Sequence, residues 1–230
     1  MNEALRKVLK RMHYPLTVML TCVRWYMAYP LSFRHIEEMM AERGVVVDHA
    51  TVHRWSLKIL PVLAKAFQHH KRTVGSSWRM DETYIKVRGR WRYLYRAVDR
   101  NGDTVDFLLT AHRDEAAARR FLKRAIDQHG KPKTITIDKS GANTAAIISY
   151  NRDHKARIAL RQCKYLNNIV EQDHRAIKRI VRPMLGFKSF RCARLLLAGV
   201  ETMHMIRKRQ LAGSNRSTAS AADQFYALAY

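Results

Sequence analysis

The sequence predicts an α/β domain preceded by a small all-helical domain, and three patterns indicate this. Apolar residues recur at helical spacing through the first third of the 230-residue chain. From residue 78 the apolar period changes to two over three successive segments, as in antiparallel strands. After residue 114 helical and strand-like segments alternate, which is typical of α/β domains.

The first third predicts a run of helices with recognisable ends. One helix begins at Leu16 and ends before Pro30, because proline interrupts helical hydrogen bonding. Ser32 is a favoured N-cap for a second helix. Gly44 ends that helix, since glycine readily adopts the left-handed conformation common at helix C-termini.

A third helix is expected after Asp48, a favoured N-cap, and Pro61 fits the first turn of a fourth helix over 62–67. The second and third helices, joined through the glycine turn, form a candidate helix-turn-helix whose second helix can enter a DNA major groove. The outward side chains that can donate hydrogen bonds to bases or phosphates are His49, Thr51, His53, Arg54 and Lys58. An ordinary three-helix bundle is the alternative.

Three strands are expected over 78–87, 91–98 and 104–110, with Asn101-Gly102 as a strong hairpin turn. The later segments predict a helix over 114–128, a buried strand over 133–138, a helix over 144–150, a fifth strand over 157–160, and helices over 167–180 and 193–208. This is the element order of the ribonuclease H-like, integrase-core fold, a mixed sheet flanked by helices.

The elements divide the chain into four expected parts. They are a helix-turn-helix DNA-binding domain over 1–69, a linker over 70–77, a ribonuclease H-like catalytic domain over 78–212, and a weakly ordered C-terminal tail over 213–230. Within the tail, Phe225 and Tyr226 are the side chains that could dock on the rest of the protein.

The charge of the chain is strongly positive, with 43 Lys and Arg against 19 Asp and Glu and a net charge of +24. Residues 1–72, 73–150 and 151–230 carry +7, +6 and +11, so every part is basic. A surface shaped only for solubility usually mixes signs. The distribution therefore favours an extended polyanion, double-stranded DNA, as the partner.

Secretion and membrane insertion are not expected. No run of about 18 apolar residues exists. Basic residues precede an apolar run over 16–23, as in a signal peptide, but Arg24 interrupts the run and no small-residue cleavage site follows. Three widely spaced cysteines favour a reducing compartment and exclude a structural zinc motif. A cytoplasmic, nucleoid-associated protein is expected.

Three acids stand out in so basic a chain: Asp81 in the first strand, Asp138 at the end of the parallel strand, and Glu171 in the late helix. Functional sites of α/β sheets gather at the carboxyl ends of strands. Converging carboxylates repel unless a cation lies between them, and Mg²⁺ takes oxygen ligands and supports phosphoryl transfer. The alternative is that the three acids only offset neighbouring Lys and Arg.

The motifs around these acids resemble those of the DDE transposases, most closely the compact bacterial insertion-sequence family six. The matching segments are Met80–Val87, Gly89–Trp91, Tyr93–Asp99, Thr104–Phe107, Asp138–Asn143, Lys164–Arg175 and Leu185–Ser189. Upstream, Val23–Tyr26, Glu37–Gly44 and Val47–His49 resemble the DNA-binding region of the family. Ala50 and His53 depart from it, standing where relatives tend to carry Ser and Tyr.

The resemblance implies that Asp81, Asp138 and Glu171 are the catalytic acids and bind Mg²⁺, with Mn²⁺ as a substitute. It implies a transposase that cuts at the terminal inverted repeats of an element and joins the freed 3′ hydroxyl to target DNA. A homodimer or larger assembly on DNA is expected, because two ends must be joined. The residues expected to hold phosphates are Lys86, Arg88, Arg90, Lys139, Arg175 and Lys178, of which Lys178 follows the glutamate by two helical turns.

Two alternatives remain from the sequence. A ribonuclease H-like nuclease or resolvase would use the same acids without strand transfer. A non-catalytic helix-turn-helix regulator would bind DNA and keep the acids for structural reasons.

Overall fold

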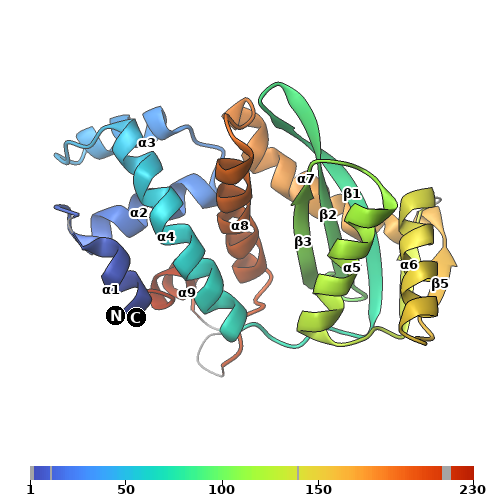
Figure 1. Ribbon diagram of the computed structural model, residues 1–230. Helices are drawn as coiled ribbons and strands as arrows, with labels where there is room; N and C mark the ends of the chain where they lie inside the picture. The colour runs from blue at the N-terminus through green and yellow to red at the C-terminus, as the bar shows by residue number, and fades with distance from the viewer. Residues whose placement is uncertain (1–2, 11, 139, 214–218) are drawn as a thin grey trace. The chain divides into compact units, whose positions relative to one another are not determined.

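The computed structural model describes residues 3–10, 12–138, 140–213 and 219–230. The chain divides into two compact units, one formed by Met1–Arg72 with Ile177–Tyr230 and the other by Thr73–Ala176. The first unit is helical and the second contains the sheet (Figure 1). None of the described helices combines the length and the apolar character needed to cross a membrane.

The helical unit is built around one long helix. Its helices are α1 (Glu3–Leu9), α2 (Leu16–Ala28), α3 (Phe33–Ala41), α4 (His49–His69), α8 (Phe190–Arg207) and α9 (Ala221–Ala227). Helix α4 packs against α1, α2, α3 and α8, and its buried face forms the centre of the unit. Residues 177–212 were expected in the catalytic domain but group with the N-terminal helices. The first segment of the helical unit ends at Arg72, which lies within the expected linker.

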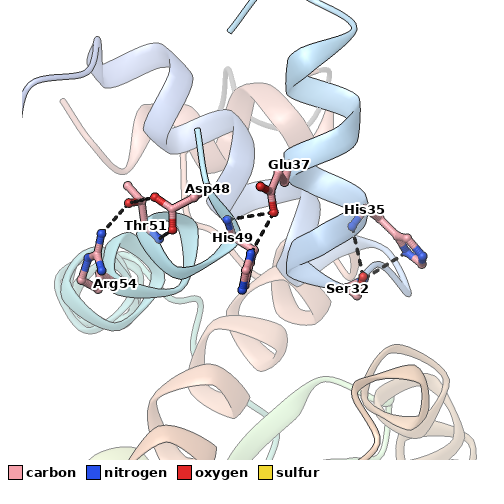
Figure 2. A network of polar contacts seen from close by, with 7 residues as sticks. All are labelled: Ser32, His35, Glu37, Asp48, His49, Thr51 and Arg54. Carbon is pink, nitrogen blue, oxygen red and sulfur yellow. Dashed lines mark hydrogen bonds and ion pairs between the residues drawn. The ribbon is translucent and has the colours of Figure 1, made fainter. Parts of the chain in front are cut away.

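The predicted helix caps of the candidate helix-turn-helix are confirmed. Ser32 Oγ accepts a hydrogen bond from the backbone of His35 at 3.1 Å, and His35 Nδ1 accepts one from the backbone of Ser32 (Figure 2). The Asp48 carboxylate likewise accepts from the backbone N–H of Thr51 at 3.0 Å. Gly44 has a φ of 71°, the left-handed conformation expected after the first helix of the pair.

Substituting Ser32 by Ala is expected to lower the free energy of unfolding by about 1 kcal/mol. The change removes the side-chain oxygen that satisfies an otherwise unpaired N–H of the first turn of α3. Urea unfolding followed by circular dichroism measures the loss. Ser32→Asp retains an acceptor and is the matched control. An unchanged stability of Ser32→Ala would show that the cap contributes nothing.

The prediction of separate third and fourth helices is wrong, since α4 continues through Pro61. An internal proline costs a helix about 3 kcal/mol. The apolar face nevertheless continues in register on both sides, and Val52, Ile59, Leu63 and Phe67 are all fully buried. Burial of each such side chain contributes about 1.5–3 kcal/mol, which outweighs the cost of the proline.

The C-terminal segment differs from the weakly ordered tail expected over 213–230, because residues 221–227 form α9. Ser220 and Asp223 cap this helix reciprocally, and Phe225 is completely buried. The hydroxyl of Tyr226 lies 3.2 Å from that of Thr21. The docking expected of the two aromatic residues is therefore confirmed.

The second unit is a five-stranded sheet of order β3-β2-β1-β4-β5. Its elements are β1 (Ser77–Val87), β2 (Arg90–Asp99), β3 (Thr104–Thr110), α5 (Glu115–His129), β4 (Thr134–Ile137), α6 (Gly141–Asp153), β5 (Ala159–Gln162), a 3-10 turn (Lys164–Asn167) and α7 (Asn168–Val181), whose last turns belong to the helical unit. β1, β2 and β3 pair antiparallel, whereas β1, β4 and β5 pair parallel. The fifth strand lies about two residues later than expected.

Helices cover both faces of this sheet (Figure 1). The ring of Tyr95 on β2 packs against Phe121 of α5, while the next residue of the strand, Arg96, contacts Asp173 of α7. Successive strand residues point to opposite faces, so α5 and α7 lie on opposite sides. A mixed sheet of this order with helices on both faces is the ribonuclease H-like fold, as the sequence predicted.

Candidate active site

Two of the predicted acids lie level with each other on neighbouring parallel strands. β1 and β4 pair Ser77 with Thr134 and Arg79 with Thr136, a constant difference of 57 in residue number (134 against 77). The same difference carried forward places Asp138, which directly follows β4, opposite Asp81. Neighbouring strands lie about 4.8 Å apart. The fold therefore brings these two carboxylates to one level of the sheet.

Helix α7 brings the third acid to the same face of the sheet. His174 of α7 lies with its Nε2 3.4 Å from Oδ2 of Asp81, and these side chains are only 6% and 18% exposed. Glu171 precedes His174 by three residues, so both lie on one face of the helix. The contact of His174 with Asp81 thus holds the face that carries Glu171 against β1.

A buried ion pair fixes the same helix to β2. Arg96 Nη1 and Asp173 Oδ2 are 2.9 Å apart, with the two side chains 0% and 8% exposed. The hydroxyl of Thr104 on β3 also donates to Asp173 at 3.4 Å. Arg96 pairs with Asp81 in the β1–β2 register, so this contact and that of His174 lie beside each other. Together they set the position of the helical turn that precedes them, where Glu171 lies.

The Asp138 carboxylate is oriented by the chain that follows it. The backbone N–H of Ser140 donates to Asp138 Oδ1 at 3.0 Å, just before α6 begins. Asp138 is half-buried.

A second polar group, which the sequence did not predict, surrounds Glu82. This side chain points to the face opposite Asp81, accepts a hydrogen bond from Asn143 Nδ2 at 2.8 Å and pairs with Arg113. Burial raises the pKa of Glu82. The contacts with Asn143 and Arg113 partly oppose this increase, and the negative charge of Asp81 adds to it. The pair Asp81-Glu82 could have indicated this group, because two adjacent acids in a strand must point to opposite faces of the sheet.

The three predicted acids suit a hard divalent cation by their donor chemistry. Asp81 and Asp138 would supply oxygen ligands at one level of the sheet, and Glu171 would supply a third from the facing helix. Among the described residues, no three His, Cys, Asp or Glu side chains are already arranged to hold a metal ion. A bound ion would therefore have to draw the three carboxylates together, offsetting their mutual repulsion.

Several of the predicted DNA contacts on α4 are engaged in local contacts (Figure 2). His49 Nδ1 lies 2.8 Å from Oε2 of Glu37 on α3. The Thr51 hydroxyl donates to Asp48 at 2.5 Å and accepts from Arg54 Nη2 at 2.5 Å. This chain of contacts holds the guanidinium of Arg54 in a fixed position at the exposed surface of α4.

The other two residues predicted on α4 have different surroundings. The ring of His53 lies 5.2 Å from that of Phe33. Burial, and then the positive charges of Lys188 and Arg54, lower the pKa of His53, so this ring is neutral at pH 7. Lys58 is exposed.

The cations predicted to hold phosphates lie at two places. Lys86, Arg88 and Arg90 are exposed at the β1–β2 hairpin, where Arg88 and Gly89 form a two-residue turn with φ of 52° and 74°. Arg175 and Lys178 are exposed on α7. Lys139 lies outside the described residues.

Comparisons with known proteins identify the family of the chain. The profile of a family described as a DDE domain matches residues 75–210. A transposase for the insertion sequence-like element IS431mec of Staphylococcus aureus is 39% identical over 193 residues, which cover 84% of this chain and 85% of the relative. A transposase for the insertion sequence element IS257 in transposon Tn4003 of Staphylococcus aureus is 38% identical with the same coverage.

Among solved structures, the HTLV-2 integrase catalytic core domain in complex with magnesium, in its trimeric form, matches with a TM-score of 0.47 and 19% identity. The match covers 66% of this chain and 97% of that chain. The family assignment depends instead on the profile match and the two staphylococcal relatives, both aligned over most of their length. The chain belongs to the DDE transposases of bacterial insertion-sequence family six.

Proposed function

We propose that this transposase cuts DNA at the ends of its insertion sequence and joins the freed 3′ hydroxyl to target DNA, using divalent metal ions held by Asp81, Asp138 and Glu171. The observation that carries the proposal is the placement of Asp81 and Asp138 at one level of neighbouring strands, beneath the helix that bears Glu171.

Mg²⁺ is the expected ion, with Mn²⁺ as a substitute, because all three predicted ligands are carboxylates. Asp81 and Asp138 would hold one ion, and Glu171 would complete a second position. When bound, the ions would activate the attacking oxygen and stabilise the leaving oxygen at phosphorus. The protein positions its own ligands through the Asp138–Ser140 hydrogen bond and the His174–Asp81 contact.

Exposed cations on the β1–β2 hairpin and on α7 suit the DNA backbone. Lys86, Arg88 and Arg90 at the hairpin and Arg175 and Lys178 on α7 would bind phosphates, and Lys139 is proposed for the same role. Each contact would add affinity that depends on salt and not on base sequence.

Recognition of the element ends is assigned to the helix pair α3 and α4. Arg54 and Lys58 are exposed on α4, and Arg54 is already held by Thr51. We propose that α4 enters the major groove of the terminal inverted repeats, with His49, Thr51 and His53 beside these two contacts. Two ends must be joined in one event, so a homodimer or larger assembly on DNA is proposed, acting at the bacterial nucleoid.

Incubation of the purified chain with end-bearing DNA and a supercoiled plasmid tests the proposal. With Mg²⁺, products joined through the 3′ strand of the end are expected on sequencing gels, and EDTA should abolish them. Cleavage without joining would identify a nuclease or resolvase instead. Binding without cleavage, in Mg²⁺ and in Mn²⁺, would identify a regulator and contradict the proposal.

A further inference from the structure

An exposed group of aromatic rings lies on the β1–β2 hairpin. Tyr84 contacts Trp91 edge-on at 6.3 Å between ring centroids, and its ring lies 5.4 Å from that of Tyr93. Tyr84 pairs with Tyr93 in the register, and Lys86 pairs with Trp91, so all four side chains share one face of the sheet. We call Tyr84, Trp91 and Tyr93 the hairpin aromatic cluster.

The exposure of this face rises toward the tip of the hairpin. Tyr95 is fully buried against α5, whereas Tyr84 is 46% exposed and Trp91 is 60% exposed. The hairpin extends beyond the end of α5 in Figure 1. The rings of Tyr84 and Trp91 are therefore exposed to solvent near the tip of the hairpin and do not belong to the apolar core.

The strand segments that carry the cluster are strongly basic. Residues 83–98 contain five Lys or Arg residues and no Asp or Glu. The side chains nearest the tip, Lys86, Arg88 and Arg90, are exposed. The core of a protein–protein interface is usually depleted of charge. Aromatic rings set among cations are instead the arrangement that binds single-stranded nucleic acid, the rings stacking on bases and the cations holding phosphates.

The cluster and Asp81 lie on opposite faces of the sheet. Tyr84 and Tyr93 share the face of Glu82 and Tyr95, which α5 covers, whereas Asp81 pairs with Arg96 on the face that α7 covers. Arg113, in the loop before α5, pairs with Glu82 on the face of the cluster. A DNA strand bound at Asp138 would therefore have to pass around the edge of β1 to reach the rings.

We propose that Tyr84, Trp91 and Tyr93 form a stacking platform for an unpaired base of the DNA strand that enters the active site. A base inside a duplex has both faces covered by its neighbours, so stacking on Trp91 requires a base that has left the helix. The platform would favour DNA that is opened beside the cut. This inference depends on the proposed function, since it takes the strand bound at the acids as its ligand.

Binding of the full chain to two DNA probes without metal tests the platform. One probe is a blunt duplex, and the other is the same duplex with a single-stranded overhang that contains 2-aminopurine. Trp91→Ala is expected to weaken binding of the overhang probe about tenfold, because a stacked base contributes strongly to affinity, while blunt-duplex binding changes less than about twofold. Quenching of 2-aminopurine should occur with the unsubstituted chain and disappear with Trp91→Ala.

Matched variants separate stacking from loss of folding. Trp91→Phe keeps a ring and should retain most of the discrimination, and Tyr84→Ala should reduce it independently. Ile148→Ala removes another exposed apolar side chain, 57% exposed on α6, and should leave both affinities unchanged. Unaltered thermal unfolding of each variant is expected from circular dichroism.

Equal loss of affinity for both probes in Trp91→Ala would overturn the platform, and so would undiminished quenching in this variant. A DNA-free oligomer that Trp91→Ala dissociates would also overturn it, because the cluster would then be a contact between copies of the chain. Its failure is distinct from failure of the proposed function. If the unsubstituted chain transfers strands but Trp91→Ala keeps its discrimination, only the platform is wrong. If it quenches 2-aminopurine without transferring strands, the platform stands and the proposed function fails.

Discussion

Replacing Asp138 by Asn is expected to lower strand transfer by at least about a thousandfold, while DNA affinity stays within about twofold. Asparagine keeps the shape of the side chain and the oxygen that accepts from Ser140, but it loses the negative charge that would hold a metal ion. Loss of metal stabilisation at the reacting phosphorus raises the activation barrier by several kcal/mol. Each 1.4 kcal/mol of barrier lowers the rate about tenfold. Gel assays of joined product, and fluorescence anisotropy for binding, measure the two effects separately.

Asp127→Asn is the matched control, because Asp127 is an exposed acid of the same unit that pairs only with its neighbour Lys123 among the described residues. This variant should keep full strand transfer. Persistent strand transfer by Asp138→Asn would show that the catalytic assignment is wrong. A collapse of thermal stability in Asp138→Asn would instead assign the carboxylate a structural role.

The order of strands and the positions of the acids on them could be predicted from the sequence, because both depend on local signals. The change of period at residue 78 and the Asn101-Gly102 turn mark the strands. The Asp48 N-cap and Gly44 mark the helix pair. Each of these signals lies within a few residues of the element it specifies, so the element forms where the signal stands.

The features that were missed depend on contacts between residues far apart in the sequence. Pro61 is a local stop signal, yet the buried face on both sides of it keeps α4 continuous. Phe225 is buried, and its helix α9 packs against α8 and against α2 near the other end of the chain, which composition near the C-terminus does not show. Local propensity is a weak guide wherever packing stabilises a different arrangement.

The candidate site likewise combines residues that local signals predict with residues that depend on distant contacts. The sequence identified Asp81 as an acid in a strand, but its partner His174 and the buried pair of Arg96 with Asp173 follow only from the path of α7 across the sheet. A basic residue in a strand of a chain with net charge +24 gives no sign that it is fully buried. The places of the three acids on their elements could therefore be predicted, whereas the residues packed beside them required the structure.

Asp173→Leu is expected to lower the free energy of unfolding of the sheet unit by about 3–5 kcal/mol. The guanidinium of Arg96 is fully buried, and the change removes the carboxylate 2.9 Å from it. A charge left in the interior without its counter-ion costs several kcal/mol. Urea unfolding of the full chain should show an earlier transition, and hydrogen exchange should locate the loss in α7 and β2.

The double change Arg96→Met with Asp173→Leu separates the charge effect from the packing effect. Replacing both partners by apolar groups should restore most of the stability, since neither charge is then left buried alone. Glu171 lies two residues before Asp173 on α7, so strand transfer should fall in Asp173→Leu and recover in the double variant. A loss below about 1 kcal/mol in Asp173→Leu would show that the pair does not hold α7 on the sheet, and the positioning of Glu171 would then depend on His174 alone.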